Sequence, residues 1–227
     1  MNDKVTLIVA TRERSLNVVR FWQSFKNTVT TDDVDIFFLV DTDDIVTQQT
    51  IKNRCGQETK MIISKRENVP IRINAVWPEV TSDIVGLFGD DIIFQTKSWD
   101  RRIVEAFKTW PDEIGVVYGS DGFQNENLCT HPFLSRKWIE TLGYAAYDGF
   151  FHYCVDTWLH DVARRVNRLL YLPNVLFEHM HPDAHKAKPD LLRRCKVKYF
   201  QHDVDILEST VKQREEDVEK LMKAMTT

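Results

Sequence analysis

An apolar run broken by two adjacent carboxylates occupies residues 83–94, which read DIVGLFGDDIIF. The segment Ile84–Phe88 has the character of a buried strand, and Asp90 and Asp91 follow it directly. Acidic side chains are almost never fully buried without a partner. A core strand that ends in two acids therefore calls for a cationic group, and a divalent metal ion is one common solution. A solvated Gly-Asp-Asp turn is the simpler alternative.

Short apolar runs alternate along the chain with segments of helical periodicity. The runs predict strands at 5–10, 35–40, 60–63, 84–88, 114–118 and 175–181. The periodic segments predict helices from 15 onward and at 47–54, 70–77, 99–110, 135–142 and 156–169. This alternation is typical of an α/β layered fold with a mostly parallel sheet flanked by helices. Ligands of such sheets gather beyond the carboxyl ends of the strands.

Length and charge exclude several classes of protein. The 227 residues fit one substantial domain, expected at 1–190, followed by a C-terminal helical extension at 191–227. A net charge of −4 provides no overall basic field for nucleic acid or an anionic membrane. We expect no membrane span and no leader, because no apolar stretch is long enough to span a bilayer and residues 1–4 lead directly into a short strand-like run without an apolar h-region. The isolated cysteines predict reduced thiols in a cytoplasmic protein; they are Cys55, Cys129, Cys154 and Cys195.

The C-terminal segment carries apolar side chains at alternating spacings of three and four residues. They are Val197, Phe200, Val204, Leu207, Val211, Val218 and Leu221. Arg214 interrupts this stripe at one expected seam position. The pattern suits a two-stranded coiled coil, and hence a homodimer through the C-terminal helix. A helix that packs back on its own domain fits the pattern equally well.

Polar and charged residues follow three of the predicted strands. They are Thr11 and Arg12 after the first strand, Asp41 and Asp43 after the second, and Asp90 and Asp91 after the fourth. A parallel sheet brings such ends together, and the set suits a sugar nucleotide: one carboxylate accepts hydrogen bonds from the base or ribose, and another holds a metal ion at the diphosphate. Arg12 with Lys65 or Arg66 would complete a phosphate clamp. Taken singly, each of these charges is typical of a solvated loop.

Two histidines close the last predicted strand. His179 and His181 are two residues apart, so both would project from the same face of a strand. Such a pair, with carboxylates nearby, suits a metal site with nitrogen and oxygen ligands, as manganese accepts. In the alternative, one histidine is hydrogen-bonded in the core and the other is solvated before Pro182.

Asp156 stands at the start of a predicted helix. Its structural role would be that of an N-cap residue, which accepts a hydrogen bond from a backbone amide of the first helical turn. Its functional role would be that of a general base, with Tyr153 and Trp158 beside it lining an acceptor site.

The order of these segments resembles that of GT-A glycosyltransferases of the family 2 type, over about residues 4–190. The matching segments are Val5 to Arg12, Phe37 to Asp41, Phe88 to Asp91, Leu134 to Arg136 with Leu142 to Tyr144, Val155 to Leu159, and Glu178 to His181. The resemblance implies that Asp91, with Asp90 beside it, binds the metal and the donor diphosphate. It also implies that Asp156 is the catalytic base and that His179 or His181 completes the metal shell.

This chain departs from the family pattern at two places. Asp90 and Asp91 are adjacent, whereas the family motif spaces its acids by one residue. The acceptor-side motif has two acids in the family and reads Val155-Asp156 here.

By analogy, we expect a metal-dependent transferase that uses Mn²⁺ or Mg²⁺. It would move a sugar from a nucleotide-sugar donor, with a UDP-sugar favoured, to an acceptor hydroxyl with inversion of configuration. The acceptor would be a glycan or a hydroxymethylated DNA base.

Two other functions compete with this one. A nucleotidyltransferase would share the layered fold but would need a glycine-rich basic loop where residues 11–14 read TRER. A non-catalytic glycan- or nucleic-acid-binding module could use two basic clusters, and its mark would be salt-dependent retention on DNA. These clusters are Arg164, Arg165 and Arg168, and Arg193, Arg194, Lys196 and Lys198.

Overall fold

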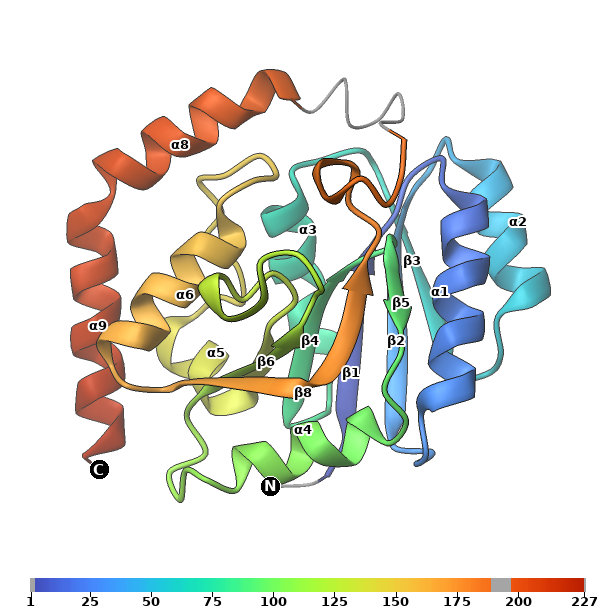
Figure 1. Ribbon diagram of the computed structural model, residues 1–227. Coiled ribbons are helices and arrows are strands. Elements are labelled where there is room, and N and C mark those ends of the chain that lie inside the picture. Colours follow the sequence, from blue (N-terminus) through green and yellow to red (C-terminus); the bar gives the residue numbers. More distant parts are fainter. Residues whose placement is uncertain (1–2, 189–196, 227) are drawn as a thin grey trace.

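The structure is a computed structural model that describes residues 3–188 and 197–226. This part of the chain forms an eight-stranded sheet in the order β3-β2-β1-β4-β7-β6-β8-β5 (Figure 1). The strands are β1 (Val5–Ala10), β2 (Val34–Asp41), β3 (Thr59–Ser64), β4 (Ile84–Gly89), β5 (Ile92–Phe94), β6 (Val116–Ser120), β7 (Phe133–Ser135) and β8 (Leu169–His179). The α-helices are α1 (Ser15–Thr28), α2 (Ile45–Arg54), α3 (Val69–Val76), α4 (Trp99–Phe107), α5 (Arg136–Leu142), α6 (Val155–Arg165), α8 (Phe200–Ser209) and α9 (Val211–Met225).

The first four long strands are parallel and confirm the predicted α/β fold. β1 pairs with β2 on one side and with β4 on the other. Ala10 lies opposite Leu39 in one pair and opposite Gly89 in the other. The residues that follow these three strands therefore emerge at one edge of the sheet. The other half is mixed, because β7 runs antiparallel to β4 and β6, and β5 runs antiparallel to β8.

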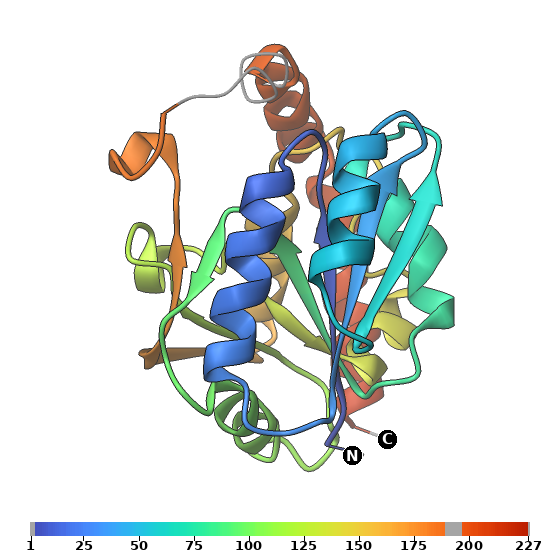
Figure 2. The ribbon, with the colours of Figure 1, turned by 90° about the vertical axis from the view of Figure 1, so that its right-hand side faces the viewer.

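Alternating side chains of the sheet build two cores. Leu7 and Val9 face a core that contains residues of α1, α2 and α4, whereas Ile8 faces a core with residues of α3, α5, α6 and α9. Figure 2 shows α1 and α3 on opposite sides of the sheet. Burial on both faces explains why the parallel strands read as continuous apolar runs in the sequence.

Several predicted boundaries differ from the structure, most clearly those of α4, α6 and β8. α4 ends at Phe107, three residues before the predicted end. α6 ends at Arg165, because Asn167 has φ +55° and the Arg168 amide donates to the Ala163 carbonyl at 2.8 Å, a hydrogen bond that closes a helix C-terminus. Leu169, predicted as helical, starts β8. β8 ends at His179, so His181 lies beyond the strand.

The C-terminal helices pack on their own domain. Leu221 is fully buried in the core that α5 and α6 share. The Arg214 guanidinium lies 5.2 Å from the Trp158 ring centre and donates to Asp161 at 3.0 Å. Part of the apolar stripe is therefore used within the chain, at Val204, Leu207, Val218 and Leu221, whereas Phe200 and Val211 stay exposed. The structure provides no support for the homodimer. The expected boundary at 190/191 lies outside the described residues, as do Arg193, Arg194, Cys195 and Lys196.

Two further expectations concern the membrane and the thiols. Within residues 3–188 and 197–226, no helix has both the length and the apolar character that a membrane crossing requires. Cys55, Cys129 and Cys154 are free thiols, as the sequence predicts.

The packing of α9 yields a stability prediction. Leu221→Ala should lower the free energy of unfolding by about 2 to 5 kcal/mol, because it removes a buried side chain and leaves a cavity. Met222→Ala is the matched control, since the Met222 side chain is 53% exposed on the same helix. Urea denaturation measures both variants. Equal, small effects would contradict the packing of α9 on its own domain.

Candidate functional site

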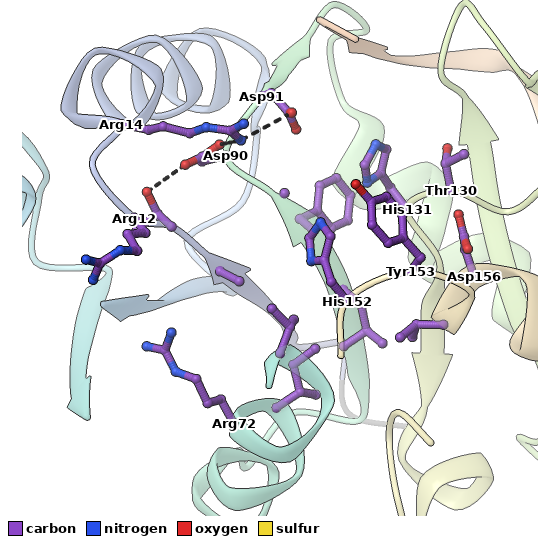
Figure 3. A pocket seen from close by; sticks show the side chains of 18 of the residues that line it. Arg12, Arg14, Arg72, Asp90, Asp91, Thr130, His131, His152, Tyr153 and Asp156 are labelled. Carbon is purple, nitrogen blue, oxygen red and sulfur yellow. Dashed lines mark hydrogen bonds and ion pairs between the residues drawn. The ribbon is translucent and has the colours of Figure 1, made fainter. Parts of the chain in front are cut away.

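A cavity of about 330 Å³ opens at the carboxyl ends of β1, β2 and β4 (Figure 3). Its lining includes eight residues predicted from the sequence: Thr11, Arg12, Asp41, Asp90, Asp91, Asp156, His179 and His181. The structure thus brings these side chains together around one cavity. Asp43 and Lys65, both described residues, are outside the lining, where Arg66 stands in place of Lys65. Asp43 accepts hydrogen bonds from the Arg12 guanidinium at 2.6 and 3.0 Å.

Asp41 joins two arginines at the end of β2. One carboxylate oxygen accepts from Arg12 and the other from Arg72, each at 2.6 Å. Arg12 is therefore held by the acids that follow β2. In Figure 3 it lies on the opposite side of Asp90 from Arg14. This arrangement differs from the expected phosphate clamp, because the Arg12 guanidinium is already engaged by two carboxylates.

Arg72 is a functional candidate that the sequence did not indicate. It is buried, and its Nε and Nη2 atoms have no hydrogen-bond partner among the described residues. Burial lowers the pKa of Arg72, and the neighbouring Asp41 carboxylate opposes this shift. Unpaired buried donors are costly, so donors at a cavity wall indicate a place for a ligand acceptor atom.

Asp90 and Asp91 are compensated by Arg14. Asp90 is 1% exposed and accepts from Thr11 at 2.6 Å, from Arg14 at 3.0 Å and from Asn17 at 3.3 Å. Arg14 also lies 3.5 Å from Asp91. Burial raises the pKa of Asp90, Arg14 opposes this shift, and the adjacent Asp91 charge adds to it. The cationic group expected beside these two acids is thus the guanidinium of Arg14, just before α1.

His179 stands between two carboxylates. Its Nε2 lies 3.5 Å from Asp91 and its Nδ1 lies 3.8 Å from Asp121. Burial lowers the pKa of His179, but the two carboxylates outweigh it and raise this pKa to about 9. The rings of His131 and His181 each lie 4.8 Å from the His179 ring.

Asp121 and His131 could not be predicted as site residues, because neither follows a strand that the sequence predicts to end at the site. Asp121 is 1% exposed and accepts hydrogen bonds from the amides of Phe123, Gln124 and Asn125 at 2.9, 2.7 and 2.8 Å. Burial and the neighbouring His179 lower the pKa of His131 to about 3, so this ring is neutral.

The donor atoms of this cluster fit a divalent metal ion. In the described parts of the chain, no group of three or more His, Cys, Asp or Glu side chains is already arranged to hold a metal. The Nε2 of His131 is nevertheless buried there without a hydrogen-bond partner. Imidazole nitrogen beside carboxylate oxygen is a ligand set that Mn²⁺ accepts. The types of donor atom therefore fit a divalent metal ion, although the side chains are not yet arranged around a common point as metal ligands.

Asp156 faces the cavity from the first turn of α6. Cys154, with φ +66°, is the N-cap residue, so the prediction of Asp156 as the cap is wrong. The Oδ1 atom of Asp156 accepts a hydrogen bond from the Thr157 amide at 2.8 Å, and burial raises the pKa of Asp156. Figure 3 shows Asp156 with Thr130 and Tyr153 on one side of the cavity, and Arg12 and Arg72 on the other.

Comparisons with known proteins give the fold. No family model matches the sequence, and no curated protein sequence matches it either. A mannosyltransferase of Pyrobaculum calidifontis, solved with GDP-Man and Mn²⁺, aligns with a TM-score of 0.57 at 13% identity, over 78% of this chain and 56% of that one. S. aureus TarS aligns with a TM-score of 0.58 at 11% identity, over 80% of this chain and 38% of that one.

A shorter form of TarS, residues 1–349 in complex with UDP, aligns with a TM-score of 0.58 at 12% identity. This alignment covers 77% of our chain and 59% of that chain. Our chain therefore spans about three fifths or less of the solved proteins that it resembles. At these identities the likeness shows the fold, and it confirms the predicted GT-A type of α/β architecture.

The compensation of the two acids after β4 can be tested. Arg14→Gln should lower the free energy of unfolding by about 1 to 3 kcal/mol, because it leaves the buried Asp90 charge without its cation. Arg101→Gln, at an exposed arginine of α4, is the matched control. Chemical denaturation at neutral pH compares the two. An Arg14 variant as stable as the control would show that Arg14 does not compensate Asp90.

Proposed function

Given this glycosyltransferase fold, we propose that the protein is a metal-dependent glycosyltransferase that moves a sugar from a nucleotide-sugar to an acceptor hydroxyl. One observation carries the proposal. A single cavity is lined by Asp41 at the end of β2, by the two acids after β4, by the imidazoles of His131, His179 and His181, and by Asp156 on its other side. The carboxylates and imidazoles suit the binding of a metal ion with a diphosphate, and Asp156 suits the role of a general base.

We propose that the base of the donor lies against Asp41 and Arg72. A carboxylate acceptor stands there beside unpartnered guanidinium donors. This pair complements the imide edge of uracil, in which an N–H group is flanked by carbonyl oxygens. Guanine carries a similar N–H and carbonyl pair. The UDP-sugar expected from the sequence fits this pattern, and UDP and GDP-Man are the ligands in the similar structures.

The metal, Mn²⁺ or Mg²⁺, would be held by Asp91 and by His179 and His181, with His131 beside them. The Asp121 carboxylate lies on the Nδ1 side of His179, where it would orient the ring so that Nε2 faces the Asp91 side. When bound, a divalent ion supplies positive charge that neutralises the donor diphosphate. Arg14, already beside Asp90 and Asp91, adds a fixed positive charge at the same place.

Asp156 would act as the base. The acceptor oxygen forms a bond to the anomeric carbon, the bond from that carbon to the diphosphate oxygen breaks, and the acceptor proton passes to the Asp156 carboxylate. A pKa raised by burial makes this carboxylate a stronger base than a solvated aspartate. Direct displacement of this kind inverts the configuration at the anomeric carbon.

His152 and Tyr153 line the cavity on the Asp156 side. Aromatic faces of this kind stack on sugars and on nucleobases. We therefore propose a glycan or a hydroxymethylated DNA base as the acceptor.

Nucleotide binding is the first test. A saturating concentration of UDP, at about a hundred times its Kd and with Mn²⁺ present, should raise the Tm by roughly 5 to 10 °C, because it binds only the folded state. EDTA should remove most of this shift, and Asp91→Asn should show little dependence on Mn²⁺. A panel of UDP, GDP, ADP and CMP identifies the base. If no nucleotide shifts the Tm with Mn²⁺ or Mg²⁺, the proposed function is wrong.

The role of Asp156 has its own test. Asp156→Asn should lower the rate of UDP release from a UDP-sugar by about 10²- to 10⁴-fold, because it removes the base and preserves the shape of the side chain. Calorimetry should find UDP binding with Mn²⁺ unchanged. Asp161→Asn, on the same helix but directed at Arg214, is the control for effects on the fold. A variant that loses UDP binding would instead place Asp156 in the donor site. Binding without turnover in the wild type would favour a binding module.

A further inference from the structure

A buried aspartate of α8 holds the segment that leads into α6. Residues 149–154, all within the described part of the chain, form neither helix nor strand. The amides of Phe151, His152 and Tyr153 donate to the Asp203 carboxylate at 2.8, 2.9 and 2.7 Å. Asp203 is fully buried, and it is separated from this segment by about fifty residues of chain. One side chain thus satisfies three consecutive backbone donors.

Other contacts fix the same segment from both sides. The Phe151 carbonyl accepts from the amide of Val69, at the start of α3, at 3.2 Å. The Phe151 ring lies 4.7 Å from the Tyr199 ring, and the Tyr153 ring lies 5.4 Å from the Phe200 ring. The segment is therefore held between α3 and the start of α8.

The chemistry of Asp203 suits this task better than any neutral side chain does. Backbone N–H groups outside regular structure need another acceptor when they are buried. An ionised carboxylate offers only acceptor sites, and hydrogen bonds to it are strengthened by its charge. Its Oδ1 serves Phe151, and its Oδ2 serves both His152 and Tyr153. An asparagine would present an NH₂ donor to at least one of these N–H donors.

We propose that Asp203 is a positioning residue of the transfer site. By holding residues 151–153, it places His152 and Tyr153 against the cavity on the side of Asp156. This inference rests on the proposed function. It makes α8 part of the acceptor side of the site. The donor side does not depend on Asp203, because Asp41, Arg72 and Asp91 are held by the sheet and by α3.

Hydrogen exchange of the 227-residue chain tests the positioning without any ligand. In Asp203→Asn, amides 151–153 should exchange about tenfold faster or more, because local opening governs exchange. Amides of α3 other than that of Val69, which donates to the Phe151 carbonyl, should keep their wild-type rates. Asp217→Asn is the matched control: Asp217 is equally buried and lies on α9, but it accepts from the Tyr144 hydroxyl. Unchanged exchange at 151–153, or an equal increase in the control, would overturn the proposal.

A second measurement separates positioning from a general loss of structure. Binding is measured as the Kd for UDP in the presence of 1 mM MnCl₂, and activity is measured as the rate of UDP release from UDP-glucose. Asp203→Asn should keep the Kd for UDP within about twofold and lower the rate at least tenfold, whereas Asp217→Asn should change neither. Equal losses of affinity and rate in Asp203→Asn would mean that Asp203 only supports the fold.

The test also covers a wild type that does not bind nucleotide and a variant that does not fold. If the wild type binds no nucleotide of the panel, the proposed function fails, and the exchange data still decide whether Asp203 holds the segment. If Asp203→Asn does not fold, Asp203→Glu replaces it, because it keeps the charge and moves it by one methylene. Faster exchange confined to 151–153 in that variant supports the proposal, and unchanged exchange refutes it.

Discussion

The ends of three parallel strands are held together by the pairing of buried carboxylates with arginines. Asp41 and Asp90 are each 1% exposed, a condition that is strongly unfavourable for an unpaired charge. Arg12 and Arg72 pair with the first acid and Arg14 with the second, while Thr11 connects β1 to the acid after β4. The parallel pairing brings the ends of β1, β2 and β4 to one edge, and the contacts that balance the charges there link these ends and shape the donor side of the cavity.

Other buried acids follow the same rule with backbone donors in place of arginine. Asp121 accepts three amides of the turn that follows β6, and Asp203 accepts three amides of the segment before α6. Asp100 likewise accepts the amides of Thr30 and Thr31. Irregular segments cannot satisfy their own N–H groups, so a buried acid from a distant element gives them one defined position. At the cavity, Asp203 does this for the segment that carries the lining residues His152 and Tyr153.

Part of this site could be predicted from the sequence, because the residues concerned stand next to recognisable strands in the chain. Thr11, Asp41, Asp90 and Asp91 follow apolar runs whose strand character is legible, and parallel strands bring their ends together. Arg14, Arg72, Asp121 and His131 were missed, because nothing near them in the sequence indicates a distant carboxylate or a shared cavity. The strands β5 and β7 were missed for a related reason, since each has only three residues and is stabilised by pairing with remote partners.

The sequence by itself determined the alternation of strands and helices, the burial of the parallel strands on both faces, and the chemistry available at their ends. These properties depend on residues that are close together in the chain. Only the tertiary structure decided which partner each surface meets. The apolar stripe of α9 fits a second chain or its own domain equally well, and Arg214 looked like an interruption of it. Stacking on Trp158 and pairing with Asp161 turn Arg214 into a contact within the chain. Periodicity specifies that a helix face is buried, whereas three-dimensional packing specifies what covers it.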